Sequence, residues 1–318
     1  MTSHIENVNN EVLKSKNKIK VDKKSLLEKY FFFFVILLIP LSQFCIFYLG
    51  VNVNTILLSF QEYQDGVFVF KNGDLFGNFR EFFVGLSTET SLVYSLQNSS
   101  LLYLVSTIAS LPISIIISYC LFLKVKGAEL FKVVLMLPSM ISGMVWVCAF
   151  KFIFNDGLIP LLGWPINAFH SVPYQFDIML IYTAYFGLAG HLVLYLGAMT
   201  AVDASVVEYG EIDGLNTIGR LWHIILPAIY PTIVVFMMTG LAGFFTNQGP
   251  LYSFYGSKAA DERSYTFGFW LFLLVADTTK APVDYPTAAT AGVVFTLVAA
   301  PIVLLFKKLL ERVGPKED

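Results

Sequence analysis

The stretch EYGEIDGLNTIGRLWHIILPAIYP, residues 208–231, interrupts a chain that is otherwise mostly apolar. It carries charges of both signs, several glycines, two prolines and a histidine. The flanking sequence on both sides returns to runs of Phe, Leu, Val and Ile that approach the length a helix needs to cross the hydrocarbon core of a bilayer. This pattern predicts a polar loop that joins two membrane-spanning helices.

The composition places the whole chain in the membrane class. Hydrophobic residues make up 56% of it and charged residues only 14%, whereas a soluble domain usually carries about a quarter charged residues. The net charge of −2 gives no reason to expect a polyanionic partner such as nucleic acid. We therefore expect an all-α, polytopic membrane protein.

The apolar runs predict about six transmembrane helices and one further apolar helix over 265–276. That further segment is too short to span and is rich in aromatic residues, which favours an interfacial or re-entrant helix. The predicted spans are 30–51, 98–123, 131–154, 176–200, 226–247 and 287–307.

Basic residues predict the orientation. Residues 1–29 form a lysine-rich tail, the loop from Lys124 to Lys132 is basic, and so is the end of the chain, including the predicted tail 309–318. Cytoplasmic loops collect Lys and Arg, so both termini are expected in the cytoplasm, and the region 30–308 is expected to cross the plasma membrane.

The same rule leaves the acidic segment 52–97 outside and brings the loop 201–225 to the cytoplasmic side. An acidic loop on that side needs another explanation, because positive charge is the usual signal there.

The sequence lacks the motifs of several classes of enzyme and nucleotide-binding protein. There is no GxxxxGK[ST] loop for nucleotide phosphates, no HExxH and no GxSxG. The cysteines, Cys45, Cys120 and Cys148, fall in apolar runs without metal-ligand spacing and are expected to be small buried side chains. We expect no catalytic residue, no metal site and no cofactor of its own.

Residues 205–226 have the spacing of one amphipathic helix, in which the mid-segment Gly214 indicates a bend or a close backbone approach. The predicted apolar face carries Val207, Ile212, Leu215, Ile218, Leu221, Trp222 and Ile225. The other face carries Glu208, Glu211, Asn216 and Arg220. A surface helix on lipid is one reading, but such helices usually place Lys and Arg on the polar face. An acidic polar face fits a groove on a soluble partner better.

These residues resemble the EAA loop in the permease subunits of binding-protein-dependent ABC importers, of the maltose type that takes up carbohydrates. Glu208, Gly210, Asp213 and Gly214 match the motif, and Leu226 and Pro227 match its end. Tyr209 and Leu215 stand where small residues are usual. Further segments are similar to those permeases: 60–83 and 136–159 match, whereas 246–250 and 255–257 depart from the family pattern.

The resemblance implies a fold and a function. It implies the type I importer permease fold and a subunit that moves a carbohydrate, expected to be an oligosaccharide, into the cytoplasm by alternating access. It implies a second permease subunit in a heterodimer, two cytoplasmic ATPase subunits that bind ATP and magnesium, and an extracytoplasmic solute-binding protein. The loop 203–227 would be the coupling segment docked on the ATPase.

The resemblance also implies site residues. The coupling residues would be Glu208, Gly210, Asp213, Gly214, Leu215, Leu226 and Pro227. The substrate pathway would carry Thr183, Phe186, Gly187, Gly190, His191, Gly240, Gly243, Phe244, Asn247 and Gln248. Other interpretations remain open, because the glycine spacing also suits close helix packing, His191 suits a hydrogen-bonded packing role, and Asn247 and Gln248 suit a helix end.

Other functions stay open as alternatives. A stand-alone secondary carrier or channel would show ionisable residues within the membrane or inverted repeats, and neither is clear. An intramembrane enzyme would need a nucleophile and base within the spans. An ABC permease for a polyol or a glycerophosphate is also open, although a phosphate favours a basic pocket and spans four and five contain neither Lys nor Arg.

Overall fold

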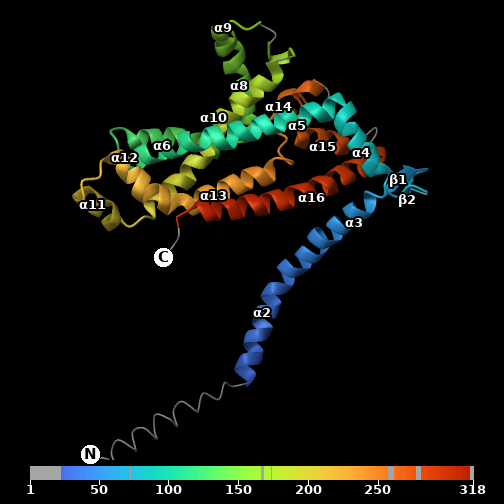
Figure 1. Ribbon diagram of the computed structural model, residues 1–318, viewed down its shortest axis with the longest axis horizontal. Helices are drawn as coiled ribbons and strands as arrows, with labels where there is room; N and C mark the ends of the chain where they lie inside the picture. Colours follow the sequence, from blue (N-terminus) through green and yellow to red (C-terminus); the bar gives the residue numbers. More distant parts are fainter. Residues whose placement is uncertain are drawn as a thin grey trace, which may run out of the picture. The chain divides into compact units, whose positions relative to one another are not determined.

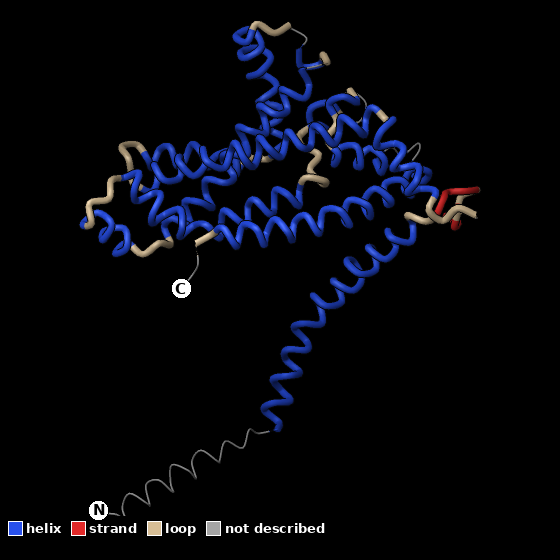
Figure 2. The backbone as a smooth tube through the Cα atoms, in the orientation of Figure 1, coloured by secondary structure: helices blue, strands red, loops and turns tan. Residues whose placement is uncertain are grey.

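The computed structural model describes residues 23–71, 73–165, 168–172, 174–256, 261–276 and 281–315. Most of the predicted N-terminal tail and the last three residues lie outside this described part, as does Ser257 of the predicted segment 255–257. The described residues are almost entirely helical, with one short hairpin (Figure 2). The predicted all-α polytopic fold is confirmed.

The chain divides into two units, residues 1–57 and 58–318. The first unit contains one long apolar helix that changes type along its length. It consists of α2 (Lys23–Gln43), the π-helical segment η1 (Phe44–Gly50) and α3 (Val51–Leu58). Lys29–Leu58 is long and apolar enough to cross a membrane, and none of its most apolar window is buried. This surface suits lipid or another transmembrane helix.

The second unit holds the remaining elements. It opens with the antiparallel hairpin β1 (Gln61–Gln64) and β2 (Val67–Phe70), in which Gln61 pairs with Phe70. The long helices follow in a bundle, joined by short helical segments (Figure 1). The elements are α4 (Gly77–Thr88), α5 (Thr90–Tyr103), η2 (Leu104–Ala109), α6 (Ser110–Phe122), α7 (Ala128–Met140), α8 (Gly143–Ile153), η3 (Phe154–Leu158), α9 (Ile159–Leu162), η4 (Ala168–His170), α10 (Tyr174–Thr200), α11 (Ala204–Ile212), α12 (Thr217–Arg220), η5 (Leu221–Ile225), α13 (Leu226–Gly243), α14 (Leu251–Tyr255), η6 (Glu262–Ser264), α15 (Phe267–Ala276) and α16 (Ala281–Val313).

Six helices of the described residues are long and apolar enough to span a membrane, as predicted. They are Lys29–Leu58, Thr90–Phe122, Gly143–Leu162, Tyr174–Thr200, Thr217–Gly243 and Pro282–Val313. In the second unit α6 packs along α10, and α13 packs along α16. The α11–α12 segment lies at one end of this unit, and α4 with the hairpin lies at the opposite end (Figure 1).

The third predicted span, 131–154, is wrong at its start. Helix α7 ends at Met140, the backbone of Ile141 is extended (φ −98°, ψ 145°), and α8 begins at Gly143. An extended residue breaks the i→i−4 hydrogen-bond ladder, so one apolar run becomes two helices. The span is Gly143–Leu162, while α7 packs against α10 and α6.

The fifth span begins earlier than predicted, because the proline at its start does not end the helix. The N–H of Leu226 bonds to the carbonyl of Leu221, five residues back, at the end of the π-helical turn η5. A π turn shifts the hydrogen-bond register and absorbs an irregularity that would otherwise kink the helix. Pro227 then falls in the first turn of α13, where a missing N–H is tolerated.

Two smaller predictions have mixed outcomes. The apolar segment 265–276 does form a short helix, α15. Its residues Phe267 and Trp270 are buried against α4, α5 and α16, in a cluster with Phe82 and Val294. The three cysteines, in contrast, are free and exposed on the surface of the described chain, so the expectation that they are buried is wrong.

Hydrogen bonds from α5 fix the segment that precedes α15. The amide of Asn98 donates to the carbonyl oxygens of Arg263 (2.8 Å) and Tyr265 (2.9 Å), and the N–H of Phe267 donates to the Ser99 hydroxyl (2.8 Å). Buried backbone groups outside regular structure need such partners. Polar side chains of α5 therefore position α15 against the bundle.

Gly268 offers a test of this packing. A Cβ at Gly268 would come within 2.6 Å of backbone atoms of Thr246 and Asn247. We expect Gly268→Ala to destabilise the protein by about 1–3 kcal/mol, because backbone cannot move aside as a side chain can. Thermal unfolding in detergent, followed by tryptophan fluorescence, measures the effect.

Gly292→Ala is the matched control, because a Cβ there meets nothing within 4 Å in the same kind of helix. It should be neutral or stabilising by up to about 1 kcal/mol. Equal unfolding midpoints for the two variants would contradict the packing described for α15.

Candidate functional site

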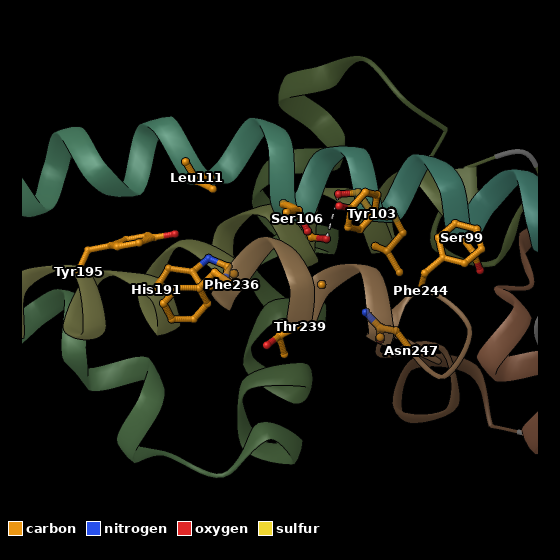
Figure 3. Close-up of a pocket in the computed structure, with 15 residues that line it drawn as sticks. Ser99, Tyr103, Ser106, Leu111, His191, Tyr195, Phe236, Thr239, Phe244 and Asn247 are labelled. Atoms are coloured by element: carbon orange, nitrogen blue, oxygen red, sulfur yellow. Dashed lines mark hydrogen bonds between the residues drawn. The ribbon is translucent and has the colours of Figure 1, made fainter. Parts of the chain in front are cut away.

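A cavity of about 390 Å³ lies between three helical segments in the middle of the second unit. Figure 3 shows α5 and η2 along one side, with α10 and α13 facing them. The lining residues are Ser99, Leu102, Tyr103, Ser106, Thr107, Leu111, Gly187, His191, Tyr195, Phe236, Thr239, Gly240, Gly243, Phe244 and Asn247. The cavity therefore combines hydroxyl and amide groups with aromatic rings.

Six of the ten residues predicted for the substrate pathway meet at this cavity. They are Gly187, His191, Gly240, Gly243, Phe244 and Asn247. The structure brings them together from α10 and from α13 with the turn that follows it.

The other four predicted pathway residues lie elsewhere. Phe186 packs its ring against Trp146 and Tyr182. The Thr183 hydroxyl is buried and has no hydrogen-bond partner among the described residues, but it does not line the cavity. Gly190 and Gln248 are exposed.

The sequence prediction missed the wall that α5 and η2 provide. Ser99, Tyr103, Ser106 and Thr107 line the cavity from this side. A signal was present, because Ser and Thr recur in steps of three or four on both sides of a gap after Ser100, along an otherwise apolar span. The buried members of this series are Ser95, Ser99, Thr107, Ser110, Ser114 and Ser118.

The glycines of α10 and α13 have different environments. A Cβ at Gly240 would come within 2.6 Å of the Thr107 hydroxyl, so close helix packing requires glycine there. A Cβ at Gly187 or Gly243 would meet nothing within 4 Å. The packing interpretation thus holds for Gly240, whereas Gly187 and Gly243 leave space beside the cavity.

Two polar atoms at one end of the cavity lack partners. The Tyr195 hydroxyl and Nδ1 of His191 are buried and have no hydrogen-bond partner among the described residues. The side chain of Tyr195 is fully buried. Both rings pack on Phe236, with centroids at 4.9 Å for His191 and 5.1 Å for Tyr195. An unpaired buried donor or acceptor costs about 1–3 kcal/mol, so these atoms favour a polar group inside the cavity.

Asn247 lies at the other end, and Thr239 lies between it and His191 (Figure 3). Oδ1 of Asn247 accepts a hydrogen bond from the N–H of Gly249 (2.8 Å), which fixes the amide, and its nitrogen is turned toward α13 in Figure 3. The Thr239 hydroxyl donates to the Val235 carbonyl (2.8 Å) and can still accept a bond. The described residues contain no group of three or more His, Cys, Asp or Glu that could hold a metal ion.

The predicted coupling segment folds as two short helices and a turn. Asp203 caps α11, since the N–H of Ser205 donates to its carboxylate at 3.0 Å. This bond lowers the pKa of Asp203, and the hydrogen bond from the Ser205 hydroxyl lowers it further. The Asn216 side chain caps α12 in the same way by accepting from the N–H of Gly219 (2.7 Å).

Gly210 and Gly214 form the turn between the two helices. The N–H of Leu215 donates to the Gly210 carbonyl (2.9 Å), and the N–H of Gly214 donates to the Glu211 carbonyl (3.0 Å). This is a Schellman motif, which needs a left-handed residue after the helix. Gly214 supplies it with φ +81°. Gly210 is buried, and a Cβ there would strike the side chain of Ile224.

The turn corrects the prediction of one amphipathic helix over 205–226. Because the helix axis changes at Gly214, the predicted apolar face does not stay on one side. Ile212 is 79% exposed, Ile218 65% and Trp222 64%. Ile225 is fully buried with Ile115 and Tyr195, while Val207 and Leu221 pack on this cluster.

The segment is tied to its own transmembrane helices. The Tyr119 hydroxyl on α6 donates to the Thr217 carbonyl (2.7 Å). Arg220 forms an ion pair with Glu211 across the turn. Glu208 and Asp213 stay exposed, as does Tyr209. The segment therefore holds a fixed shape and presents a mixed acidic and apolar surface.

Comparisons with known proteins agree with the sequence-based resemblance. No profile of a known protein family matches the chain. Over 315 residues it is 23% identical to the polygalacturonan/rhamnogalacturonan transport system permease protein YteP of Bacillus subtilis, covering 95% of this chain and 94% of that protein. It is 24% identical to the lactose transport system permease protein LacF of Rhizobium radiobacter, over 66% of this chain and 73% of LacF.

A third relative is the sn-glycerol-3-phosphate transport system permease protein UgpA of Pectobacterium atrosepticum, 21% identical over 74% of this chain and 79% of UgpA. Among solved structures, a chain of a bacterial ABC transporter involved in the import of the acidic polysaccharide alginate matches with a TM-score of 0.70 and 17% identity. It covers 92% of this chain and 99% of that one.

The prediction of the protein class is confirmed. The chain is similar to permease subunits of ABC sugar importers over nearly its whole length, and it has the fold of an ABC importer permease. It is a multi-pass membrane protein.

Proposed function

We propose that this chain is the transmembrane permease subunit of a binding-protein-dependent ABC importer that moves a carbohydrate into the cytoplasm. The observation that carries the proposal is the folded segment 203–227. Tyr119 of α6 holds it on the bundle, and the ion pair of Arg220 with Glu211 braces it internally. Glu208 and Asp213 stay exposed. Such a segment can transmit a movement of a soluble partner to the membrane helices.

The energy comes from ATP hydrolysis on two partner subunits in the cytoplasm, which also hold the nucleotide and its magnesium. Closure of these subunits moves the α11–α12 segment. Through Tyr119 and η5 the movement reaches α6 and α13, and α13 lines the cavity. The cavity then opens alternately to the two sides of the membrane.

The remaining partners follow from the same proposal. A second permease subunit completes the pathway, and an extracytoplasmic solute-binding protein delivers the carbohydrate. One solved relative is an alginate ABC transporter in complex with alginate pentasaccharide-bound periplasmic protein. In this chain the delivery end would be the one that carries β1, β2 and α4, opposite the α11–α12 segment (Figure 1).

The basic residues set the orientation. Lys124 and Lys126 lie in the turn after α6, and Lys307, Lys308 and Arg312 lie in the last turns of α16. The Tyr230 hydroxyl on α13 donates to the Leu310 carbonyl (2.7 Å), which ties the end of α16 to the helix that begins at the α11–α12 segment. Positive charge favours the cytoplasmic side, so this end is the cytoplasmic one.

Cysteine labelling in intact cells tests the orientation. In a chain whose native cysteines are replaced, Asp65→Cys should react with a membrane-impermeant maleimide in intact cells. Lys124→Cys should react only after the membrane is permeabilised. The reverse pattern would overturn the orientation without affecting the fold.

Charge reversal at Glu208 tests the coupling role. In this proposal Glu208 meets a basic residue of the ATPase. Glu208→Lys should therefore place two positive charges together and lower sugar-stimulated ATP hydrolysis of the reconstituted complex by at least about tenfold. Hydrolysis is measured in proteoliposomes with the binding protein and sugar supplied.

Glu129→Lys is the control for this experiment, since Glu129 is an exposed acid in the first turn of α7, outside the segment. It should leave the stimulated rate near that of the wild type. If Glu208→Lys kept full stimulation and normal assembly, Glu208 would have no role in coupling.

A further inference from the structure

The helices that form the cavity are almost free of charge. Residues 90–122, 174–200 and 226–250 together contain one charged side chain, Asp177, which is acidic. Among the described residues that line the cavity, none is Lys, Arg, Asp or Glu. His191 is the one imidazole among the described residues that line the cavity.

Lys151, a cation on α8, is committed elsewhere. Lys151 on α8 donates to the carbonyl oxygen of Phe254 at 2.5 Å, and its ammonium lies over the rings of Phe169 and Phe254. Phe169 and Phe254 belong to the cluster around α8, η4 and α14. None of the α13 residues that line the cavity belongs to that cluster. Lys151 therefore gives the cavity no counter-charge.

This arrangement is unfavourable for an acidic sugar. A carboxylate or phosphate that leaves water needs a cation or several strong donors in a low-dielectric site. No Lys or Arg of these cavity helices supplies such a cation, and their one charged residue, Asp177, is acidic and does not line the cavity.

The cavity wall around Tyr195 and His191 is instead suited to the hydroxyl groups of a sugar. The Tyr195 hydroxyl can donate and accept a bond, and neutral His191 carries one donor and one acceptor nitrogen. The Tyr195 hydroxyl is directed toward His191 and Phe236 along the cavity in Figure 3. Tyr195 is fully buried, and neither its hydroxyl nor Nδ1 of His191 has a partner among the described residues.

Aromatic rings complete such a site. Phe236 lies between Tyr195 and His191. The rings of Tyr103 and Phe244 meet edge to face further along, with their centroids 6.4 Å apart. Apolar ring faces can stack on the C–H faces of a pyranose, while a few placed polar groups fix its orientation.

We propose that the cargo is an uncharged oligosaccharide, and that Tyr195 and His191 are specificity-determining residues that hydrogen-bond its hydroxyl groups. This inference rests on the proposed permease function. It separates this chain from relatives whose names give an acidic polymer or a phosphate ester as their cargo.

Competitive uptake tests the charge of the cargo. Host cells and an in-frame deletion strain receive an equimolar mixture of neutral trisaccharides (malto-, cello-, xylo-, manno- and galactotriose) and uronate trisaccharides (galacturonate, mannuronate and guluronate). Mass spectrometry follows the loss of each sugar from the medium. We expect the deletion to abolish uptake of at least one neutral trisaccharide and to leave the uronates unaffected.

Variants then test the two residues with the sugar identified in this way. Tyr195→Phe and His191→Gln should each raise the half-saturating concentration about 3- to 10-fold, the effect of losing one hydrogen bond. The maximal rate per amount of chain in the membrane, measured by immunoblot, should change less. Tyr255→Phe is the matched control, because its hydroxyl is also buried without a described partner but lies outside the cavity.

The outcomes separate the two proposals. Uptake of a uronate that depends on the chain, or equal effects of Tyr195→Phe and Tyr255→Phe, would overturn the uncharged-cargo inference and leave the permease function standing. If the deletion changed uptake of no trisaccharide, the proposed carbohydrate function itself would be contradicted.

Discussion

The bilayer interior excludes charge, and this constraint organises the whole chain. A charged side chain at the centre of a spanning helix costs about 2.5–3.5 kcal/mol on insertion scales. The helices around the cavity accordingly hold one charged residue in residues 90–122, 174–200 and 226–250. Under the proposed function, the driving force enters at a membrane surface, through a segment that water can reach.

The segment 203–227 meets that need by being rigid and anchored. The left-handed Gly214 fixes the angle between α11 and α12, and the ion pair between Arg220 and Glu211 spans the turn. The bond from Tyr119 joins the segment to α6, and η5 continues it into α13. In the proposed mechanism, a displacement of the exposed surface passes through these contacts to α13, which lines the cavity.

The sequence predicted the fold well because hydropathy and helix length are local properties. It placed six spans and the short helix over 265–276, which the structure confirms. It failed where backbone geometry decided the outcome. The extended Ile141 divides one apolar run, and the π turn before Leu226 carries a helix past Pro227. Gly214 was recognised as a bend, but the direction of that bend, and so the exposure of Ile212, depends on tertiary packing.

The cavity was only half predictable for a related reason. The residues of α10 and α13 came from resemblance to known permeases, and six of them meet at the cavity. The wall from α5 and η2 was missed, because serines in an apolar helix also bond to their own backbone, as Ser95 does with Leu92. Which serines face a cavity depends on the partner helix, and a single sequence does not contain that information.

The central claim is that the chain works only with an ATPase. The most direct measurement is mild detergent purification of a tagged chain from its native host, followed by mass spectrometry of the proteins that accompany it. The account predicts a P-loop ATPase and a second, similar permease in the purified complex. A chain that elutes alone, folded and able to transport sugar without ATP, would contradict it.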